Sequence, residues 1–226
     1  MATKIGISDC LNCPIRQVSI FAGLSPAELR ELGMPVHTMR YETGETLYLE
    51  AAKPVAAYTI NHGVVKLVMS LANGRNQIVR LLSTGDIFGF EGLMDSEYHH
   101  TAVALTEVTA CRLSLADLNT LSRAKPTIRD ALMHRWAGAL RQAERMVVEL
   151  GTMKAGERLA TFLERWCGHA DEDGWTPLPL TRQELGELLG LTVETVSRFL
   201  ADWKRQGLVR EDHGRVRLTG LMAVAS

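Results

Sequence analysis

Three groups of side chains in the 226-residue sequence have types and spacings that could do chemistry. Two of the four cysteines, Cys10 and Cys13, stand three residues apart near the start of the chain, while Cys111 and Cys167 are isolated. A Cys-x-x-Cys spacing is typical of metal ligands and of redox-active thiol pairs. The sequence leaves a third interpretation open, in which these two thiols have no function.

The second group is the histidine pair His99–His100, which directly precedes Thr101. Imidazoles bind haem and metal ions, but neighbouring residues of a strand point to opposite faces, so both rings are not expected to reach one ion. We interpret the pair as solvated or hydrogen-bonded turn histidines. A cupin-type metal enzyme would need converging histidines, typically with His-x-His, which the sequence lacks. With no catalytic triad and no phosphate-binding glycine loop, the sequence predicts no enzyme.

The third group lies on a predicted helix that begins at Thr192. One face is apolar and the other carries polar side chains that suit base recognition. Arginine donates a pair of hydrogen bonds to guanine, glutamate accepts from the N4 of cytosine, and serine reaches a base or a phosphate. The apolar face holds Val196, Phe199, Leu200 and Trp203, and the polar face holds Glu194, Thr195, Ser197 and Arg198.

A second short helix precedes this one. Thr181 can cap its start with Glu184 reaching back, and Gly190 ends it. Two short helices joined by a glycine-containing turn have helix-turn-helix geometry, whose second helix enters the major groove of DNA. The alternative is an antiparallel helix pair with a solvated charged face.

The local charge balance favours DNA. Residues 195–217 hold six basic and three acidic side chains, whereas the whole chain has a net charge of −1. A local positive surplus is what phosphate contacts require. Residues 210–220, which include Arg215, fit a β-hairpin that turns at His213–Gly214.

The elements before residue 125 indicate a β domain. Residues 24–32 read as a short helix with Ser25 as its N-cap, and residues 41–114 contain short β-rich runs separated by glycine turns. The pair Asn73–Gly74 between two such runs is a strong hairpin signal. This pattern is typical of a sandwich or jelly roll.

A long helix follows from Pro126. Its apolar residues recur at alternating spacings of three and four, which is the pattern of a coiled-coil seam. The same spacing would also fit a helix packed on its own β domain, but we favour a dimer helix. The seam consists of Met133, Trp136, Leu140, Ala143, Val147 and Leu150.

Composition indicates a soluble globular chain, with 46% hydrophobic and 23% charged residues. The sequence has no apolar run of spanning length and no signal-peptide pattern, which predicts a cytoplasmic location without a membrane partner. In that reducing compartment the cysteines are not expected to form structural disulfides.

The segments "LTRQELGELLGLTVETVSRFL", "ETGETLYLEAAKPVAAYTINHGVVKLV" and "KAGERLATFL" resemble the cyclic-AMP receptor/FNR superfamily of bacterial transcription regulators. The Glu194, Ser197 and Arg198 set resembles the recognition helix of the FNR branch. The resemblance implies an α+β chain with a jelly roll, a dimerisation helix and a winged helix-turn-helix. We expect an N-terminal cysteine segment at 1–22, a sensory roll at 23–124, the dimer helix at 125–151 and the DNA-binding domain at 152–226.

The resemblance also implies partners. A homodimer would bind double-stranded DNA at a palindrome like TTGAT facing ATCAA, with Arg198 on the guanine and Glu194 on the opposite cytosine. Thr192, Thr195 and Ser197 would complete this surface, and Arg215 would contact the DNA backbone. RNA polymerase would be a further partner, and the regulated genes would respond to oxygen or redox state.

FNR-type oxygen sensors hold a [4Fe–4S] cluster, and Cys10, Cys13 and Cys111 match three of its ligands. Ser19 and Phe21 stand where the remaining N-terminal cysteine would be. An oxygen or nitrogen ligand can sometimes complete such a set, and the candidates near in sequence are Asp9, Ser19 and His37. A Cys10/Cys13 dithiol switch, another small-molecule signal and a relic site remain alternatives.

Cyclic AMP is not the expected signal. In members that bind cyclic nucleotides, a glutamate binds the ribose and an arginine pairs with the phosphate. Asp86 or Glu91 could supply a carboxylate here, but His99 and His100 stand where the arginine would be. A neutral imidazole does not replace a guanidinium group.

Overall fold

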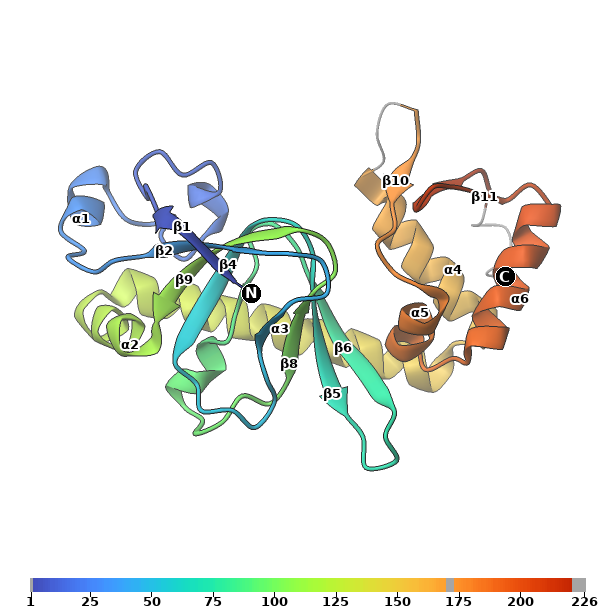
Figure 1. The fold of residues 1–226 in the computed structure, drawn as a ribbon, viewed down its shortest axis with the longest axis horizontal. Coiled ribbons are helices and arrows are strands. Elements are labelled where there is room, and N and C mark those ends of the chain that lie inside the picture. The colour runs from blue at the N-terminus through green and yellow to red at the C-terminus, as the bar shows by residue number, and fades with distance from the viewer. Residues whose placement is uncertain (1, 170–172, 221–226) are drawn as a thin grey trace. The chain divides into compact units, whose positions relative to one another are not determined.

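The computed structural model describes residues 2–169 and 173–220 (Figure 1). The chain forms two compact units, one of residues 1–74 and 79–141, the other of residues 75–78 and 142–226. Helix α3 (Pro126–Thr152) contributes to both units. Residues 221–226, the end of the domain expected at 152–226, lie outside the described residues.

Two sheets form the roll of the first unit. The β-rich runs expected between residues 41 and 114 lie on strands, and three further strands, at residues 3–7, 37–41 and 87–88, were not predicted from the sequence. The antiparallel five-stranded sheet has the order β1 (Thr3–Ile7), β2 (His37–Tyr41), β9 (Val108–Ser114), β4 (Ala56–His62) and β7 (Ile87–Phe88). The four-stranded sheet has the order β3 (Thr46–Tyr48), β8 (Thr101–Ala104), β5 (Val65–Ser70) and β6 (Asn76–Leu82). The β5–β6 connection carries the expected Asn73–Gly74 turn, with Gly74 at φ 77°.

Successive side chains along the strands of the five-stranded sheet point to opposite faces, so each face of the sheet has its own hydrophobic core. On β4, Tyr58 and Ile60 belong to the core inside the roll, whereas Ala57 belongs to a core on the other face of the sheet. Aromatic rings fill the inside, where Tyr48 stacks on Tyr98 with ring centroids 3.8 Å apart. Side chains that differ by one position in a strand therefore enter different environments.

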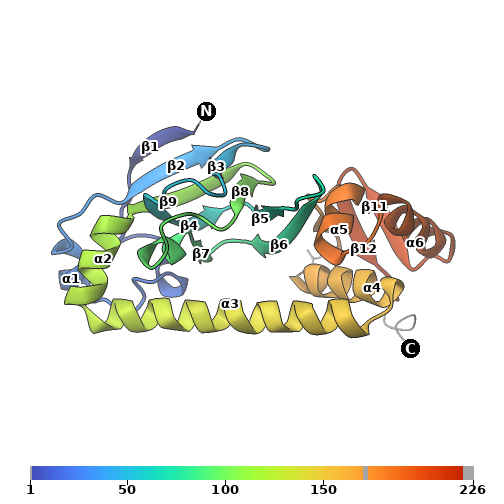
Figure 2. The same cartoon turned by 90° about the horizontal axis from the view of Figure 1, so that it is seen from below.

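Helices cover the outer face of this sheet. Figure 2 shows α2 (Leu115–Ala124) and the first part of α3 beside it, and Ile128 and Leu132 of α3 are buried in the outer core. The expected short helix is α1 (Pro26–Arg30), with Ser25 as N-cap in a capping box with Glu28. Lys125 Nζ lies 3.0 Å from Glu28 Oε1. Two short 3-10 helices, η1 (Arg16–Val18) and η2 (Phe90–Leu93), complete the unit.

The second unit combines helices with a small sheet. Its described helices are α4 (Ala155–Trp166), the 3-10 helix η3 (Cys167–His169), α5 (Arg182–Leu189) and α6 (Val193–Arg205). Its sheet has the order β10 (Thr176–Pro177), β12 (Arg215–Leu218) and β11 (Val209–Asp212). The expected hairpin turns at His213–Gly214, both with positive φ. Among residues 2–169 and 173–220, no helix is long and apolar enough to cross a membrane.

Candidate nucleic-acid interface and thiol site

The turn between α5 and α6 is built around two glycines. Thr181 caps α5 in a complete capping box with Glu184, and Gly190 ends it at φ 63°. Sequence reasoning missed the part played by Gly186, where an added Cβ would lie 2.6 Å from the carbonyl oxygen of Leu191. The Leu191 N–H donates to the Gly186 carbonyl at 3.0 Å. Only glycine allows the turn to close this tightly on α5.

Helix α6 buries one face and exposes the other. Val196, Leu200 and Trp203 are at most 2% exposed, while Glu194 and Arg198 are exposed. The predicted surface residues lie together on the first two turns, all exposed except the half-buried Thr195: Thr192, Glu194, Thr195, Ser197 and Arg198. This is the arrangement that base recognition in a major groove requires.

The charges on this face suit hydrogen bonding to bases. The pKa of Glu194 is lowered, first because its own backbone N–H donates to the carboxylate and then because the Thr192 hydroxyl does. The guanidinium of Arg198 lies 5.7 Å from the ring centre of Phe199, and it forms no ion pair with any residue in the described part of the chain. Glu194 can therefore accept hydrogen bonds, and Arg198 can donate a pair.

Arg215 begins the second strand of the hairpin. Its guanidinium lies 5.4 Å from the ring centre of Trp175, and its Nη2 is 3.7 Å from Asp212. Sequence reasoning predicted the exposed Arg215 but missed its contact with Trp175. A stacked guanidinium keeps its N–H groups available at the ring edge for phosphate oxygens.

Glu211 joins three elements of the second unit. On β11, its carboxylate accepts hydrogen bonds from Arg182 at the start of α5 and, at 3.0 Å, from Lys204 in the last turn of α6. Burial raises the pKa of Glu211, but these two bonds outweigh it, so the pKa lies below its usual value. Sequence reasoning counted Lys204 and Glu211 only as charges and did not consider Arg182. Here they hold the hairpin against both helices.

The three cysteines named as cluster ligands lie around one small cavity in the first unit. Cys10, Cys13 and Cys111 all line it, although the last is remote in sequence, and the cavity volume is about 20 Å³. That is room for roughly one water molecule. Burial raises the pKa of the Cys10 thiol to about 11, and the nearby sulfurs of Cys111 and Cys13 add to the rise.

Pairing of β9 with its neighbours places Cys111. It lies opposite Thr38 of β2 and Thr59 of β4. Its Sγ lies 3.2 Å from Ser8 Oγ, and Asn61 Nδ2 donates to it at 3.3 Å. The sulfur is therefore directed toward the segment that carries Cys10.

None of the three residues considered as a fourth cluster ligand, Asp9, Ser19 and His37, is placed to bind a cluster with the three thiols. The Asp9 carboxylate accepts the backbone N–H groups of Leu11 and Asn12, and the Ser19 hydroxyl, which lines the cavity, is bonded to the backbone at Arg16 and Phe21. His37 is adjacent to Thr38 on β2, so its side chain points to the opposite face from Cys111. Cys167 belongs to the second unit.

The described residues thus supply three thiols around a water-sized space. No group of three or more His, Cys, Asp or Glu side chains between residues 2 and 169 or 173 and 220 has the arrangement of a metal site. As they lie, these residues do not fit a four-thiolate cluster.

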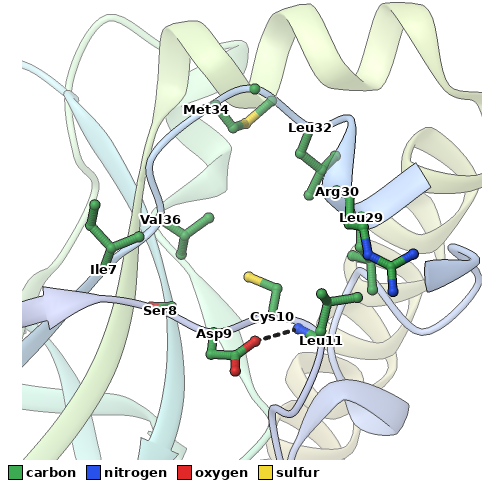
Figure 3. Close-up of a pocket in the computed structure, with 11 residues that line it drawn as sticks. Ile7, Ser8, Asp9, Cys10, Leu11, Leu29, Arg30, Leu32, Met34 and Val36 are labelled. Carbon is green, nitrogen blue, oxygen red and sulfur yellow. Dashed lines mark hydrogen bonds between the residues drawn. The ribbon is translucent and has the colours of Figure 1, made fainter. Parts of the chain in front are cut away.

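An open groove lies on the other side of Cys10. Its volume is about 240 Å³. Figure 3 shows the Cys10 thiol pointing into this space, with Met34 and Leu32 beyond it and Asp9 bonded to Leu11 below. Cys10 lines both the groove and the thiol cavity. The groove is lined by Ile7, Ser8, Asp9, Cys10, Leu11, Leu29, Arg30, Leu32, Gly33, Met34 and Val36.

The roll contains buried polar groups that lack partners. The atoms Tyr48 Oη, Arg80 Nε, Glu91 Oε1 and His100 Nδ1 are buried and make no hydrogen bond with described residues. Burial raises the pKa of Glu91 and lowers the pKa of His100. His100 Nδ1 lies 3.9 Å from Glu91 Oε1, too far for a hydrogen bond. Buried polar groups in proteins are normally satisfied by protein, water or ligand atoms.

The two histidines of the pair have different surroundings. His99 is exposed and contacts Asp95 at 3.1 Å, whereas His100 is half-buried near Glu91. Sequence reasoning did not identify Arg80 as a member of this buried polar group. The available signal was its charge, because Arg80 stands between apolar residues in β6.

Most of the predicted seam on α3 is exposed. Met133, Leu140 and Val147 are 56%, 61% and 70% exposed, and Ala143 and Leu150 are also exposed. Trp136 differs, because it packs on Phe90 of its own roll with ring centres 5.3 Å apart. Trp136 therefore shows the alternative packing on the β domain that the sequence left open, and the other seam residues form an exposed face of α3.

Comparison with known proteins agrees with these two units. The Cyclic nucleotide-binding domain family matches residues 38–125, and the Crp-like helix-turn-helix domain family matches residues 157–224. A roll of this type followed by a winged helix-turn-helix defines a class of DNA-binding transcription regulators.

Individual relatives cover nearly the whole chain. The nitrogen fixation regulation protein FixK of Bradyrhizobium diazoefficiens is 32% identical, over 92% of this chain and 89% of its own length. The fumarate and nitrate reduction regulatory protein of Escherichia coli K12 is 29% identical, over 88% and 82%. The structure of FixK2 from Bradyrhizobium japonicum superposes with a TM-score of 0.77 at 28% identity, covering 84% of this chain and 95% of that one. The chain belongs to the cyclic-AMP receptor/FNR superfamily of transcription regulators and is not an enzyme.

Proposed function

We propose that the protein binds, as a homodimer, a two-fold DNA site of the form TTGAT facing ATCAA. Arg198 donates to the guanine and Glu194 accepts from the cytosine of the opposite strand. The observation that carries this proposal is the exposed polar face at the start of α6, where both side chains stand beside Ser197.

The geometry of α6 supports this reading. The first turn of a recognition helix approaches the base edges, and Glu194 and Arg198 are four residues apart, on neighbouring positions of one helix face. Thr192 caps the helix through the Thr195 N–H. Arg215 and the other basic groups of the hairpin contact phosphates and set the orientation.

Dimerisation through α3 supplies the two-fold symmetry. The exposed seam residues from Met133 to Leu150 would pack against their copies in a parallel pair. Two recognition helices would then lie about 34 Å apart, one turn of DNA. RNA polymerase is the expected partner of the bound dimer, which would activate transcription.

The sensory unit receives the signal. The buried groups without partners in the roll, Tyr48, Arg80, Glu91 and His100, support a small polar effector there. The thiols of Cys10, Cys13 and Cys111 support redox control. A [4Fe–4S] cluster stays a prediction. Iron and sulfide analysis of anaerobically purified protein tests it, and a colourless, iron-free protein would contradict it.

The DNA assignment is tested by selection from a random duplex library followed by sequencing. The expected result is enrichment of a palindrome with TTGAT and ATCAA half-sites at a fixed spacing. A matched selection with Arg198→Ala should lose the preference for guanine at one position of each half-site. Failure of the wild type to enrich any two-fold motif would contradict the proposal.

A further inference from the structure

We propose that Cys10 is a site of reversible thiol modification by small disulfides that carry a carboxylate, and that Cys111 is the thiol that releases the modifier. The product is an intramolecular Cys10–Cys111 disulfide. This thiol chemistry does not depend on the DNA sequence that the protein recognises.

The groove gives a small molecule access to Cys10. Its volume of about 240 Å³ is open to solvent, and the Cys10 thiol points into it (Figure 3). The opposite wall is apolar, with Leu29, Leu32 and Met34. A disulfide with its short apolar arms can lie against these side chains while one sulfur faces Cys10.

A charged group at the groove selects the modifier. The exposed Arg30 guanidinium makes no hydrogen bond or ion pair with any residue that the structure describes. It can therefore donate to a carboxylate. The Asp9 carboxylate lies on the same segment as Cys10 and accepts hydrogen bonds from the backbone of Leu11 and Asn12 and from the Asn12 side chain, so it is not assigned to the modifier (Figure 3). Arg30 suits the α-carboxylate of an amino-acid disulfide, which cystine and oxidised glutathione share.

Cys111 is placed to complete the reaction. Cys10 lines both the groove and the cavity, and Cys111 lines the cavity together with Cys13. Ser8 Oγ lies 3.2 Å from Cys111 Sγ, and Asn61 Nδ2 donates to it at 3.3 Å. These contacts hold its sulfur beside the residue 8–10 segment.

The reaction is two thiol–disulfide exchanges. The Cys10 thiol first gives its proton to water, which happens in a minor fraction of molecules near neutral pH because burial raises its pKa, and the thiolate attacks one sulfur of R–S–S–R. The S–S bond of the modifier breaks, and R–S⁻ leaves and takes up a proton. The Cys111 thiolate then attacks the Cys10 sulfur of the mixed disulfide, and the second R–SH leaves. Two protein thiols are oxidised by two electrons, and the modifier is reduced to two small thiols.

The test uses full-length reduced protein incubated with cystine, acid-quenched, alkylated and measured by intact mass and peptide mapping. The wild type should end two hydrogens lighter, with Cys10 linked to Cys111 and no adduct. Cys111→Ser should keep one cysteinyl group on Cys10. Cys10→Ser should form neither product, and the matched controls Cys13→Ser and Cys167→Ser should behave as the wild type.

A second arm tests recognition without altering the thiols. Arg30→Gln should slow modification by cystine and by oxidised glutathione roughly two- to fivefold, as expected for an exposed ion pair. It should not slow modification by cystamine, which lacks carboxylates. Because the substitution is exposed, the protein should fold normally. If Arg30→Gln and the wild type reacted at equal rates with all three disulfides, Arg30 would not recognise the carboxylate of the modifier.

Other outcomes overturn the thiol assignment. The first is initial modification of the wild type at Cys13 or Cys167. The second is a Cys10–Cys13 disulfide, in place of the Cys10 adduct, in the Cys111→Ser variant. The third is iron and sulfide bound to the three thiols of the isolated protein. DNA binding of the reduced protein is measured on the same sample. Loss of specific DNA binding there would count against the proposed function and not against the thiol reaction.

Discussion

The surface proposed to read DNA and the thiol site are built in opposite ways. Glu194 and Arg198 are exposed on one regular helix. Cys10 and Cys111 are half-buried and line one cavity, although Cys10 follows β1 and Cys111 lies on the distant strand β9. A reading surface needs free hydrogen-bonding groups on a rigid support. A sensing site needs groups whose state can change the packing around them. The protein therefore places the proposed DNA recognition on an exposed helix face and the proposed sensing in a half-buried group of side chains.

The largest effect is expected at the dimer seam. Ala143→Asp would bury a carboxylate beside its own copy, at a cost of several kcal/mol per buried charge, so the dimer should split. Arg145→Asp introduces the same side chain on the opposite face of α3 and should leave the dimer intact. Sedimentation velocity measures both variants. A dimer that persists in Ala143→Asp would mean that this face does not form the interface.

Core substitutions should distinguish the two units. Trp203→Ala removes a side chain that is 2% exposed, and should cost about 3–5 kcal/mol of stability in the DNA-binding unit. Phe88→Ala, at 1% exposed, should have a similar cost in the roll. Hydrogen exchange should rise mainly in the substituted unit, because each has its own core. A uniform rise over both units would contradict this independence.

The next effect is on base recognition. Arg198→Ala should cost about 1–3 kcal/mol of binding free energy and relax specificity at one base pair of each half-site. Arg215→Ala should weaken binding to all sequences alike and reduce the salt dependence. Anisotropy titrations against single-base variants of the palindrome separate the two patterns. An equal loss on every variant for Arg198→Ala would remove it from base recognition.

A smaller effect is expected at Glu211, where a substitution should change non-specific and specific DNA affinity in opposite directions. Glu211→Gln releases Arg182 and Lys204 from the carboxylate. Non-specific affinity should rise, with a salt slope steeper by roughly 0.9 for each new phosphate contact. Specific affinity should fall, because the hairpin is less firmly held. Glu187→Gln serves as the control, because the half-buried Glu187 on α5 of the same unit accepts a hydrogen bond from Gln183, which a glutamine can still accept. Parallel changes of both affinities in Glu211→Gln would argue against this role.

The smallest effect concerns acid stability of the first unit. The pKa of Glu28 is lowered to about 2, first by the Ser25 backbone N–H and then by Lys125. A lowered pKa contributes stability above the unfolded value, near 4.5, that is lost as the pH falls toward about 2. Glu28→Gln should therefore be less stable than the wild type at pH 6 and equal to it near pH 2. A difference independent of pH would exclude this ionisation as the cause.

Much of the DNA-binding unit could be predicted because its signals are local. The capping box at Thr181, the glycine at 190 and the apolar face of α6 lie within one short stretch of sequence, and each is confirmed. Gly186 was missed because its constraint comes from the Leu191 carbonyl, which approaches only in the folded turn.

The first unit was harder to predict from sequence. Strand β1 is almost entirely exposed, including Ile5 and Ile7, and has a bulge between Lys4 and Gly6, so its two apolar residues do not mark a buried face. Helix α2 did have a signal, because Leu115, Leu118 and Leu121 recur every third residue after the Ser114 cap. It was missed because it follows β9 without a turn.

The thiol site depends on strand pairing. Ser8 and Cys111 are 103 residues apart in the chain, yet their side chains touch. Periodicity and spacing cannot place Cys111 beside Cys10, and only the family resemblance suggested it. The groove beside Cys10 had no sequence signal, because it arises where the N-terminal segment passes residues 29–36.

The most direct test of the account is the affinity of the reduced wild-type dimer for two duplexes of equal length at physiological salt. One carries TTGAT and ATCAA half-sites one helical turn apart, and the other has a scrambled sequence of the same composition. The account predicts that the palindrome binds at least roughly a thousandfold more tightly. Equal affinity for the two duplexes would contradict it.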